Sequence, residues 1–190
     1  MSRWLLLALF TLPAIALTDS ETVAVVAHPP FATYYTCSEH SANLDLGPGD
    51  ALGSDCVVQE FPEETDRYWL RSHVGDGTRN EDWYGWRERV LSPCDCIVSD
   101  VHVNKITNTP GKMTPGRASS VQLRREDGVN FVIAHVREID VAVGDSVQYG
   151  QPLARVGNNG YSRHPHIHLG AWKEDEPLQV RFDLRHKAVH

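Results

Sequence analysis

The sequence has no excess of basic charge and no long apolar run beyond its first residues. Its 190 residues include 18 Lys and Arg against 25 Asp and Glu, which gives a net charge of −7 and a pI near 5.8. This balance argues against a diffuse basic surface for nucleic acid or anionic lipid. The apolar run 4–12 is about half the length of a membrane-spanning helix, and no later stretch comes closer. We therefore predict no nucleic-acid partner and no membrane span in the mature protein.

The N-terminal residues have the pattern of a secretory signal. A short segment with Arg3 precedes the apolar run, and Pro13 and the triplet 14–16 follow it. An N-terminal helix packed on the domain is the alternative, but neither a polar face nor a cap supports it. We predict a signal peptide over residues 1–16 and an exported protein, periplasmic or secreted.

The sequence also lacks the 3.6-residue apolar repeat of helices. After residue 82, short β-rich runs alternate with turn signals, and the Asp127–Gly128 pair indicates a hairpin. We predict a mostly β fold with an antiparallel sheet or sandwich and long loops, preceded by an irregular, partly β region over residues 17–80. The predicted strands are 90–91, 97–103, 120–124, 129–134, 146–147, 153–156, 167–172 and 178–182.

Four cysteines, Cys37, Cys56, Cys94 and Cys96, allow two disulfides in three pairings. Export favours disulfides over free thiols. In a straight strand Cys94 and Cys96 would lie about 6.6 Å apart, at the upper limit for a bridge, so they can bond only if the chain bends between them. Cys37–Cys56 is therefore the favoured pair, and a Cys-x-Cys metal site is the alternative for the other two.

Histidines are frequent, with ten in the chain, and three of them lie at His164, His166 and His168. In an extended strand His166 and His168 point to one face while Ile167 points to the other. Ile167, Leu169 and Ala171 make the opposite face apolar. This pattern predicts a strand buried on one side, with both imidazoles able to reach one ion or one substrate; two solvent-facing strand histidines are the plainer alternative.

The region around these histidines resembles a known family. The order of residues reads AHV…VAVGDSVQYGQPLARVGNNGYSRHPHIHLGAW, in which a lone His135 ends a strand, a Gly-Asp and Gly-Gln hairpin follows, and a His-x-His closes the motif. This order is similar to that of the lysostaphin-type, or LytM-like, zinc metallopeptidases. The similarity extends over residues 82–172.

The resemblance implies a compact antiparallel β core of the duplicated hybrid, or barrel-sandwich, kind over residues 81–190. It also implies hydrolysis of peptide cross-links in bacterial peptidoglycan with Zn²⁺ as cofactor. By the family pattern, Asp82 and His168 bind the metal, and His135 and His166 act as base or transition-state stabiliser. Catalytic zinc uses three protein ligands from His and carboxylate and leaves an open position for water.

The sequence departs from the family pattern at the first metal ligand. The family has a His four residues before the Asp, where this chain has Thr78. His73, or less readily Asn80, is the candidate for the third ligand, because two ligands would hold zinc poorly.

Two rival functions follow from the same features. The hairpin near residues 144–150 also resembles biotinyl and lipoyl carrier domains, but no Lys lies between Arg137 and Arg163 to carry such a group. The second rival is a degenerate, non-catalytic family member that binds cell-wall peptide or regulates a partner amidase. The Thr78 substitution favours this rival, and the retained His135, His166 and His168, together with Asp82, oppose it.

Overall fold

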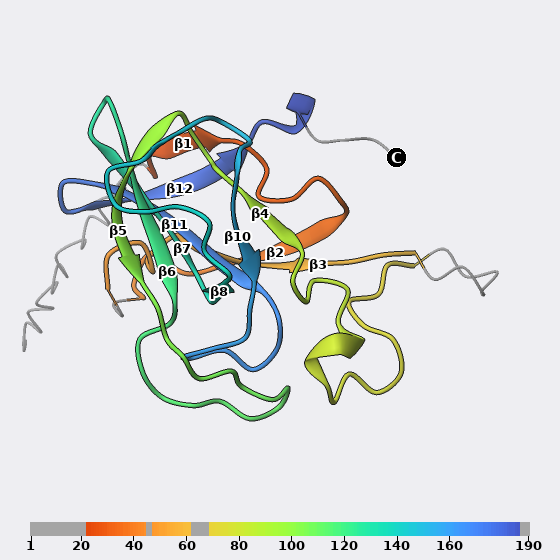
Figure 1. Ribbon diagram of the computed structural model, residues 1–190. Helices are drawn as coiled ribbons and strands as arrows, with labels where there is room; N and C mark the ends of the chain where they lie inside the picture. Colours follow the sequence, from red (N-terminus) through yellow and green to blue (C-terminus); the bar gives the residue numbers. More distant parts are fainter. Residues whose placement is uncertain (1–21, 45–46, 62–68, 187–190) are drawn as a thin grey trace, which may run out of the picture.

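The structure, a computed structural model, describes residues 22–44, 47–61 and 69–186 (Figure 1). The predicted signal peptide lies outside them. The strands are β1 (Ala24–Ala27), β2 (Tyr35–Glu39), β3 (Ser54–Val58), β4 (Arg89–Leu91), β5 (Cys96–His102), β6 (Ser120–Arg125), β7 (Val129–Ala134), β8 (Val136–Arg137), β9 (Ser146–Val147), β10 (Pro152–Val156), β11 (Ile167–Lys173) and β12 (Glu176–Phe182). Within the described residues the helical elements are two 3₁₀ turns, η1 (Asn80–Asp82) and η2 (Leu184–His186), and no helix could span a membrane.

The strands form one large curled sheet and one small sheet. In the large sheet β1, β12, β11, β7, β6, β5 and β9 follow one another, and β3 joins the edge of β11 and carries β2. The small sheet has the order β4, β10, β8. Every pairing is antiparallel except β1 with β12, which is parallel. The mostly β prediction is confirmed.

The predicted strands agree with the structure to within two residues at each end. Asp127 and Gly128 form the turn between β6 and β7, where Gly128 takes a positive φ of 87° that favours glycine. The predicted irregular region contains β1, β2 and β3, which join the large sheet. The domain boundary at residue 81 stays a prediction. Strands from both sides of this residue belong to one sheet.

The core lies against the inner face of the large sheet. Ile167, Leu169 and Ala171 of β11 are at most 1% exposed, as the alternating pattern predicts. Phe131 and Ile133 of the neighbouring β7 are equally buried. β11 is central in the sheet, so burial of its apolar face fixes the register of the strand. That register sets the positions of His166, just before β11, and of His168 within it.

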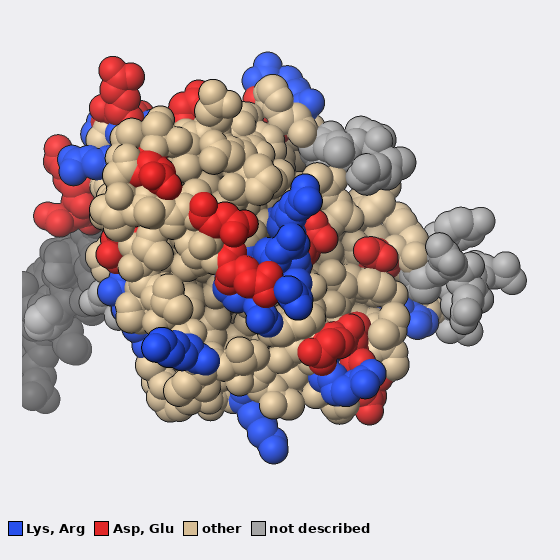
Figure 2. All heavy atoms as spheres, viewed as in Figure 1, with Lys and Arg blue, Asp and Glu red and all other residues tan. Residues whose placement is uncertain are grey.

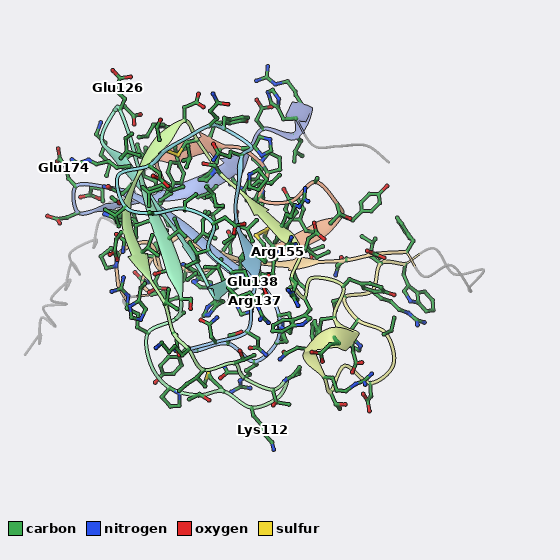
Figure 3. The ribbon with its side chains drawn as sticks, viewed as in Figure 1. Lys112, Glu126, Arg137, Glu138, Arg155 and Glu174 are labelled. Carbon is green, nitrogen blue, oxygen red and sulfur yellow. A yellow bond between two sulfur atoms is a disulfide. The ribbon has the colours of Figure 1, made fainter. Side chains whose placement is uncertain are left out.

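The small sheet is cross-linked on its surface by three arginines that share one glutamate. Glu138 pairs with Arg87, Arg137 and Arg155, at 2.9, 3.2 and 3.3 Å. Figure 3 shows Arg137, Glu138 and Arg155 side by side near β8 and β10. On the face in Figure 2 basic and acidic side chains are interspersed rather than separated. Exposed pairs of this kind contribute about 0–1 kcal/mol each, so they add little to the free energy of unfolding.

Two disulfides are present. Cys37 bonds to Cys56, which confirms the favoured pair. Cys94 also bonds to Cys96, with a Cα–Cα distance of 5.5 Å. The chain bends over residues 93–95, and this bend removes the obstacle that a straight strand would present. No described cysteine is free.

Truncation of a buried isoleucine should destabilise the protein more than truncation of an exposed one. We expect Ile133→Ala, at a side chain 1% exposed, to lower the free energy of unfolding by about 2–5 kcal/mol because it leaves a cavity. The matched change Ile97→Ala, at a side chain 48% exposed, should cost about 0.5 kcal/mol or less. Urea unfolding monitored by circular dichroism measures both. Equal losses in the two variants would contradict the placement of β7 in the core.

Candidate metal site and groove

Three strands bring His40, Asp55 and His168 together. Asp55 lies on β3, where its Cα is paired with Ser38 of β2 on one side and with His168 of β11 on the other. Residues directly opposite each other in antiparallel strands present their side chains on the same face. His40 follows the last residue of β2, and its backbone N–H donates to the Gly53 carbonyl. Strand register therefore places the Asp55 carboxylate between two imidazoles.

Each of these imidazoles has one nitrogen held by the backbone and the other turned toward Asp55. His40 Nδ1 donates to the Asp50 carbonyl at 3.1 Å, and its Nε2 lies 3.3 Å from an Asp55 oxygen. His168 Nε2 donates to the Gly49 carbonyl at 3.0 Å, and its Nδ1 lies 3.1 Å from the other Asp55 oxygen. Because a carbonyl only accepts, it fixes one ring proton and leaves the second nitrogen for a proton or a metal ion.

The Asp55 carboxylate sets the electrostatics of the cluster. Burial opposes a charge on His168, but the hydrogen bond and charge of Asp55 outweigh burial and raise the pKa of this histidine. Burial also opposes ionisation of Asp55, yet the bond from His168 and the nearby His166 and His40 lower the pKa of this carboxyl. The cluster therefore favours a bound cation, either a proton on His168 or a metal ion that replaces it.

The donor set fits zinc. Zinc takes imidazole nitrogen and carboxylate oxygen at about 2.0–2.2 Å, so neighbouring ligand atoms in a tetrahedral site lie roughly 3.4 Å apart. Asp55 reaches the two imidazoles through different oxygens, with Oδ2 at 3.3 Å from His40 Nε2 and Oδ1 at 3.1 Å from His168 Nδ1, so it is the donor types of this cluster that match zinc. Two imidazoles and one carboxylate are also the usual ligand number of a catalytic site, which keeps one position open.

A second carboxylate, Asp50, lies in the same cluster. The ligand atoms of His40, Asp50 and His168 all lie within 4.8 Å of one another, and Asp50 Oδ1 is 3.6 Å from His168 Nε2. That nitrogen is the one already bonded to Gly49. Asp55 instead faces both nitrogens that the backbone leaves free, and for this reason we favour Asp55 over Asp50 as the carboxylate ligand.

The loop that carries Asp50 can approach β11 only because of glycines. A Cβ on Gly170 would collide with the Gly49 carbonyl, and a Cβ on Gly53 would lie 2.7 Å from the His168 ring. Gly49 itself has a φ of +89°. The loop backbone therefore lies directly on the strand, and its carbonyl can orient His168.

His135 and His166 form a pair beside the metal cluster. Their ring centroids are 4.6 Å apart, and His166 Nε2 lies 3.8 Å from Asp55 Oδ1. His135 Nδ1 donates to the Asn159 carbonyl and His166 Nδ1 to the His164 carbonyl, both at 2.8 Å. Burial lowers the pKa of His135 to about 3 and also lowers that of His166. Both rings are therefore neutral near pH 7, with Nε2 available to accept a proton.

A groove of about 1030 Å³ opens over this cluster. Its lining includes Gln122 of β6 and Val132 of β7, together with residues near the cluster: Leu44, Gly47, Pro48, Met113, Gly116 and Ala118. The side chains that give it chemical character are His40, Asp50, Asp55, His135 and His168, together with the ion pair of Arg117 and Asp100 and the exposed Tyr161. A cleft of this volume is large enough to hold several residues of a peptide.

Asp82 lies in η1 and is engaged elsewhere. Its two oxygens accept hydrogen bonds from the backbone and guanidinium of Arg79, at 2.7 to 3.1 Å, and these bonds lower the pKa of its carboxyl. The His73 ring packs against Trp83 at an angle of 49°, and the Asn80 amide donates to the Asn108 carbonyl and accepts from the Asn158 amide. The potential metal group among the described residues contains none of the three.

The sequence prediction missed His40, Asp50 and Asp55. They lie in a region that the sequence pattern marked only as irregular. One signal was available, since a histidine and several aspartates fall in a Gly-rich segment between the two cysteines predicted to bond. Of the predicted site residues, the structure brings together His135, His166 and His168.

Comparison with known proteins agrees with this geometry. Residues 87–180 match the model of peptidase family M23. Over these residues the chain belongs to family M23. This M23 segment contains His135, His166 and His168, whereas the strands that supply His40 and Asp55 precede it. No curated protein matches the chain.

Three solved structures are similar to this chain at low identity. The catalytic domain of a mutant of the prophage-encoded M23 protein EnpA from Enterococcus faecalis is 16% identical, with a TM-score of 0.50 and coverage of 80% of this chain and 92% of that one. The catalytic domain of the antimicrobial peptidase lysostaphin from Staphylococcus simulans is 20% identical, with a TM-score of 0.43 and coverage of 73% and 80%. A zinc-containing peptidase from Vibrio cholerae is 22% identical, with a TM-score of 0.40; the match covers 48% of this chain and only 25% of that one.

Three aspartate variants should identify the carboxylate ligand. We expect Asp55→Asn to weaken zinc binding by more than about 100-fold, because it removes the charge of a ligand, and Asp50→Asn to weaken it by about 10-fold. Asp82→Asn should change the zinc Kd by less than about 3-fold, since Asp82 is bonded to Arg79. Competition with a chromophoric chelator measures all three. A large loss in Asp82→Asn alone would restore the assignment made from the sequence.

Proposed function

We propose that this chain is an exported zinc metalloendopeptidase that hydrolyses peptide cross-links of bacterial peptidoglycan. The observation that carries the proposal is the convergence of His40, Asp55 and His168 under a groove that also contains the neutral His135. Family M23 membership supports a peptide substrate. The proteins EnpA and lysostaphin, described as an M23 catalytic domain and an antimicrobial peptidase, share the fold.

Export is part of the same proposal. Two disulfides persist only where the surroundings are oxidising, and peptidoglycan lies outside the cytoplasmic membrane. The secretory signal predicted between Arg3 and Ala16 would direct the chain across the cytoplasmic membrane. Full-length, Met1-initiated protein in the cytosol would contradict export.

We assign the residues of the site three roles: metal binding, alignment of the peptide and proton transfer. His40, Asp55 and His168 would hold the metal, and zinc, when bound, polarises the scissile carbonyl and makes water a better nucleophile. The groove walls would align an extended peptide over them. His135 and His166, neutral and with Nε2 free, would take the proton from the attacking water and return it to the leaving amine.

Variants of the histidines should separate metal binding from proton transfer. We expect His135→Ala and His166→Ala to keep stoichiometric zinc and to lower kcat on peptidoglycan peptides by about 10²- to 10⁴-fold. His168→Ala should lose both metal and cleavage because it removes a ligand. The measurements are zinc content by mass spectrometry and release of new amines from purified peptidoglycan. Cleavage at the parental rate by all three variants would remove these histidines from the active site.

The alternative is a binding module that occupies the same groove without cutting. Its support is Thr78, which stands where the family pattern has a His. His40 offers a ligand from a different part of the chain and weakens that support. A wild-type protein that retains cell-wall peptide, or a partner amidase, and releases no amine would favour this alternative.

A further inference from the structure

The Cys37–Cys56 disulfide closes a loop that contains most of the proposed metal ligands. The two cysteines are 19 residues apart, and His40, Asp50 and Asp55 all lie between them. Cys37 and Cys56 are directly opposed in the β2–β3 ladder. His40 is three residues after Cys37, and Asp55 is the residue before Cys56. The covalent bond therefore lies at the middle pair of the ladder, next to the pair that contains Asp55.

The strand that leads to His40 is an edge strand. Among the described residues β2 pairs only with β3, along five residue pairs. β3 is better held, because it also pairs with β11. At the two ends of β2, Tyr35 packs against the core and Glu39 forms an ion pair with Arg181 of β12. Beyond these contacts, the position of His40 relative to Asp55 depends on a short ladder and on the disulfide across it.

We propose that the Cys37–Cys56 disulfide is a positioning element of the metal site, so that zinc affinity depends on the oxidation state of this pair. The inference rests on the proposed metal site. The bond restricts the loop before zinc arrives, so that binding does not have to order His40 and Asp55 from a mobile hairpin. By linkage, bound zinc must protect the disulfide to the same degree that the disulfide strengthens zinc binding.

The second disulfide offers a matched control. Cys94–Cys96 joins residues only two positions apart at the start of β5, which pairs with β6 and β9. None of the proposed ligands lies on these strands. Cys56, Cys94 and Cys96 are all buried, so removal of either disulfide also removes buried sulfur from the core.

The first test compares two double variants of the full chain. We expect Cys37→Ala/Cys56→Ala to bind zinc about 10- to 100-fold more weakly than the parent, and Cys94→Ala/Cys96→Ala to bind within about 3-fold of it. Alanine is used because free thiols would bind zinc themselves. Chelator competition gives Kd, and circular dichroism of the metal-free proteins establishes that each is folded. Equal affinities in the parent and in Cys37→Ala/Cys56→Ala would overturn the inference, as would an equal loss in the control variant.

The second test uses the parent and does not require either variant to fold. A water-soluble phosphine reduces each disulfide: the S–S bond breaks, phosphorus is oxidised to the phosphine oxide with the oxygen of a water molecule, and the two protons of that water go to the thiols. We expect zinc to slow the reduction of Cys37–Cys56 by about 10-fold or more, because the phosphine reaches the buried Cys56 only when the hairpin opens locally and bound zinc opposes that opening, with no effect on Cys94–Cys96. Alkylation and peptide mass mapping follow both bonds in one sample.

The outcomes separate this inference from the proposed function. Unchanged reduction of Cys37–Cys56 in a parent that binds stoichiometric zinc overturns the inference alone. A parent that binds no zinc overturns the proposed metal site and the inference with it. Zinc-dependent protection in a parent that cleaves nothing supports the positioning role and contradicts only the peptidase.

Discussion

The site depends on one carboxylate placed between two imidazoles by the pairing of three strands. Asp55 faces His40 across the end of β2 and His168 across β11, at 3.3 and 3.1 Å. A half-buried anion of this kind is costly unless cations or hydrogen-bond donors surround it. The two histidines meet that requirement in the metal-free protein, and a zinc ion would meet it more fully. The rest of the local structure fixes these three side chains in place.

Backbone carbonyls orient the four histidine rings of the site. The segment with Gly49 and Asp50 lies on β11 because Gly170 has no side chain, and its carbonyls bond one nitrogen of each ligand histidine. Asn159 and His164 hold His135 and His166 in the same way. The backbone therefore holds one nitrogen of each imidazole and leaves the other free, which is the preorganisation that both metal binding and proton transfer require.

The sequence predicted the sheet and, of the candidate site, the residues His135, His166 and His168. Alternation in Ile167–Lys173 and the turn at Asp127–Gly128 are local signals, so the strands around His135 and His168 could be located to within two residues. His40 and Asp55 could not be found in this way, because they reach His168 through pairing with strands more than 100 residues away in sequence. The family pattern directed attention instead to Asp82, whose oxygens bond to Arg79.

A zinc-bound crystal structure with diffraction recorded on both sides of the zinc absorption edge tests the central claim most directly. We expect one anomalous peak per chain, within about 2.0–2.2 Å of His40 Nε2, an Asp55 oxygen and His168 Nδ1, with its open side toward the groove and the His135–His166 pair. A peak bound by Asp82 with His73 or Asn80, or a fully loaded crystal with no peak at the His40–Asp55–His168 cluster, would contradict the account.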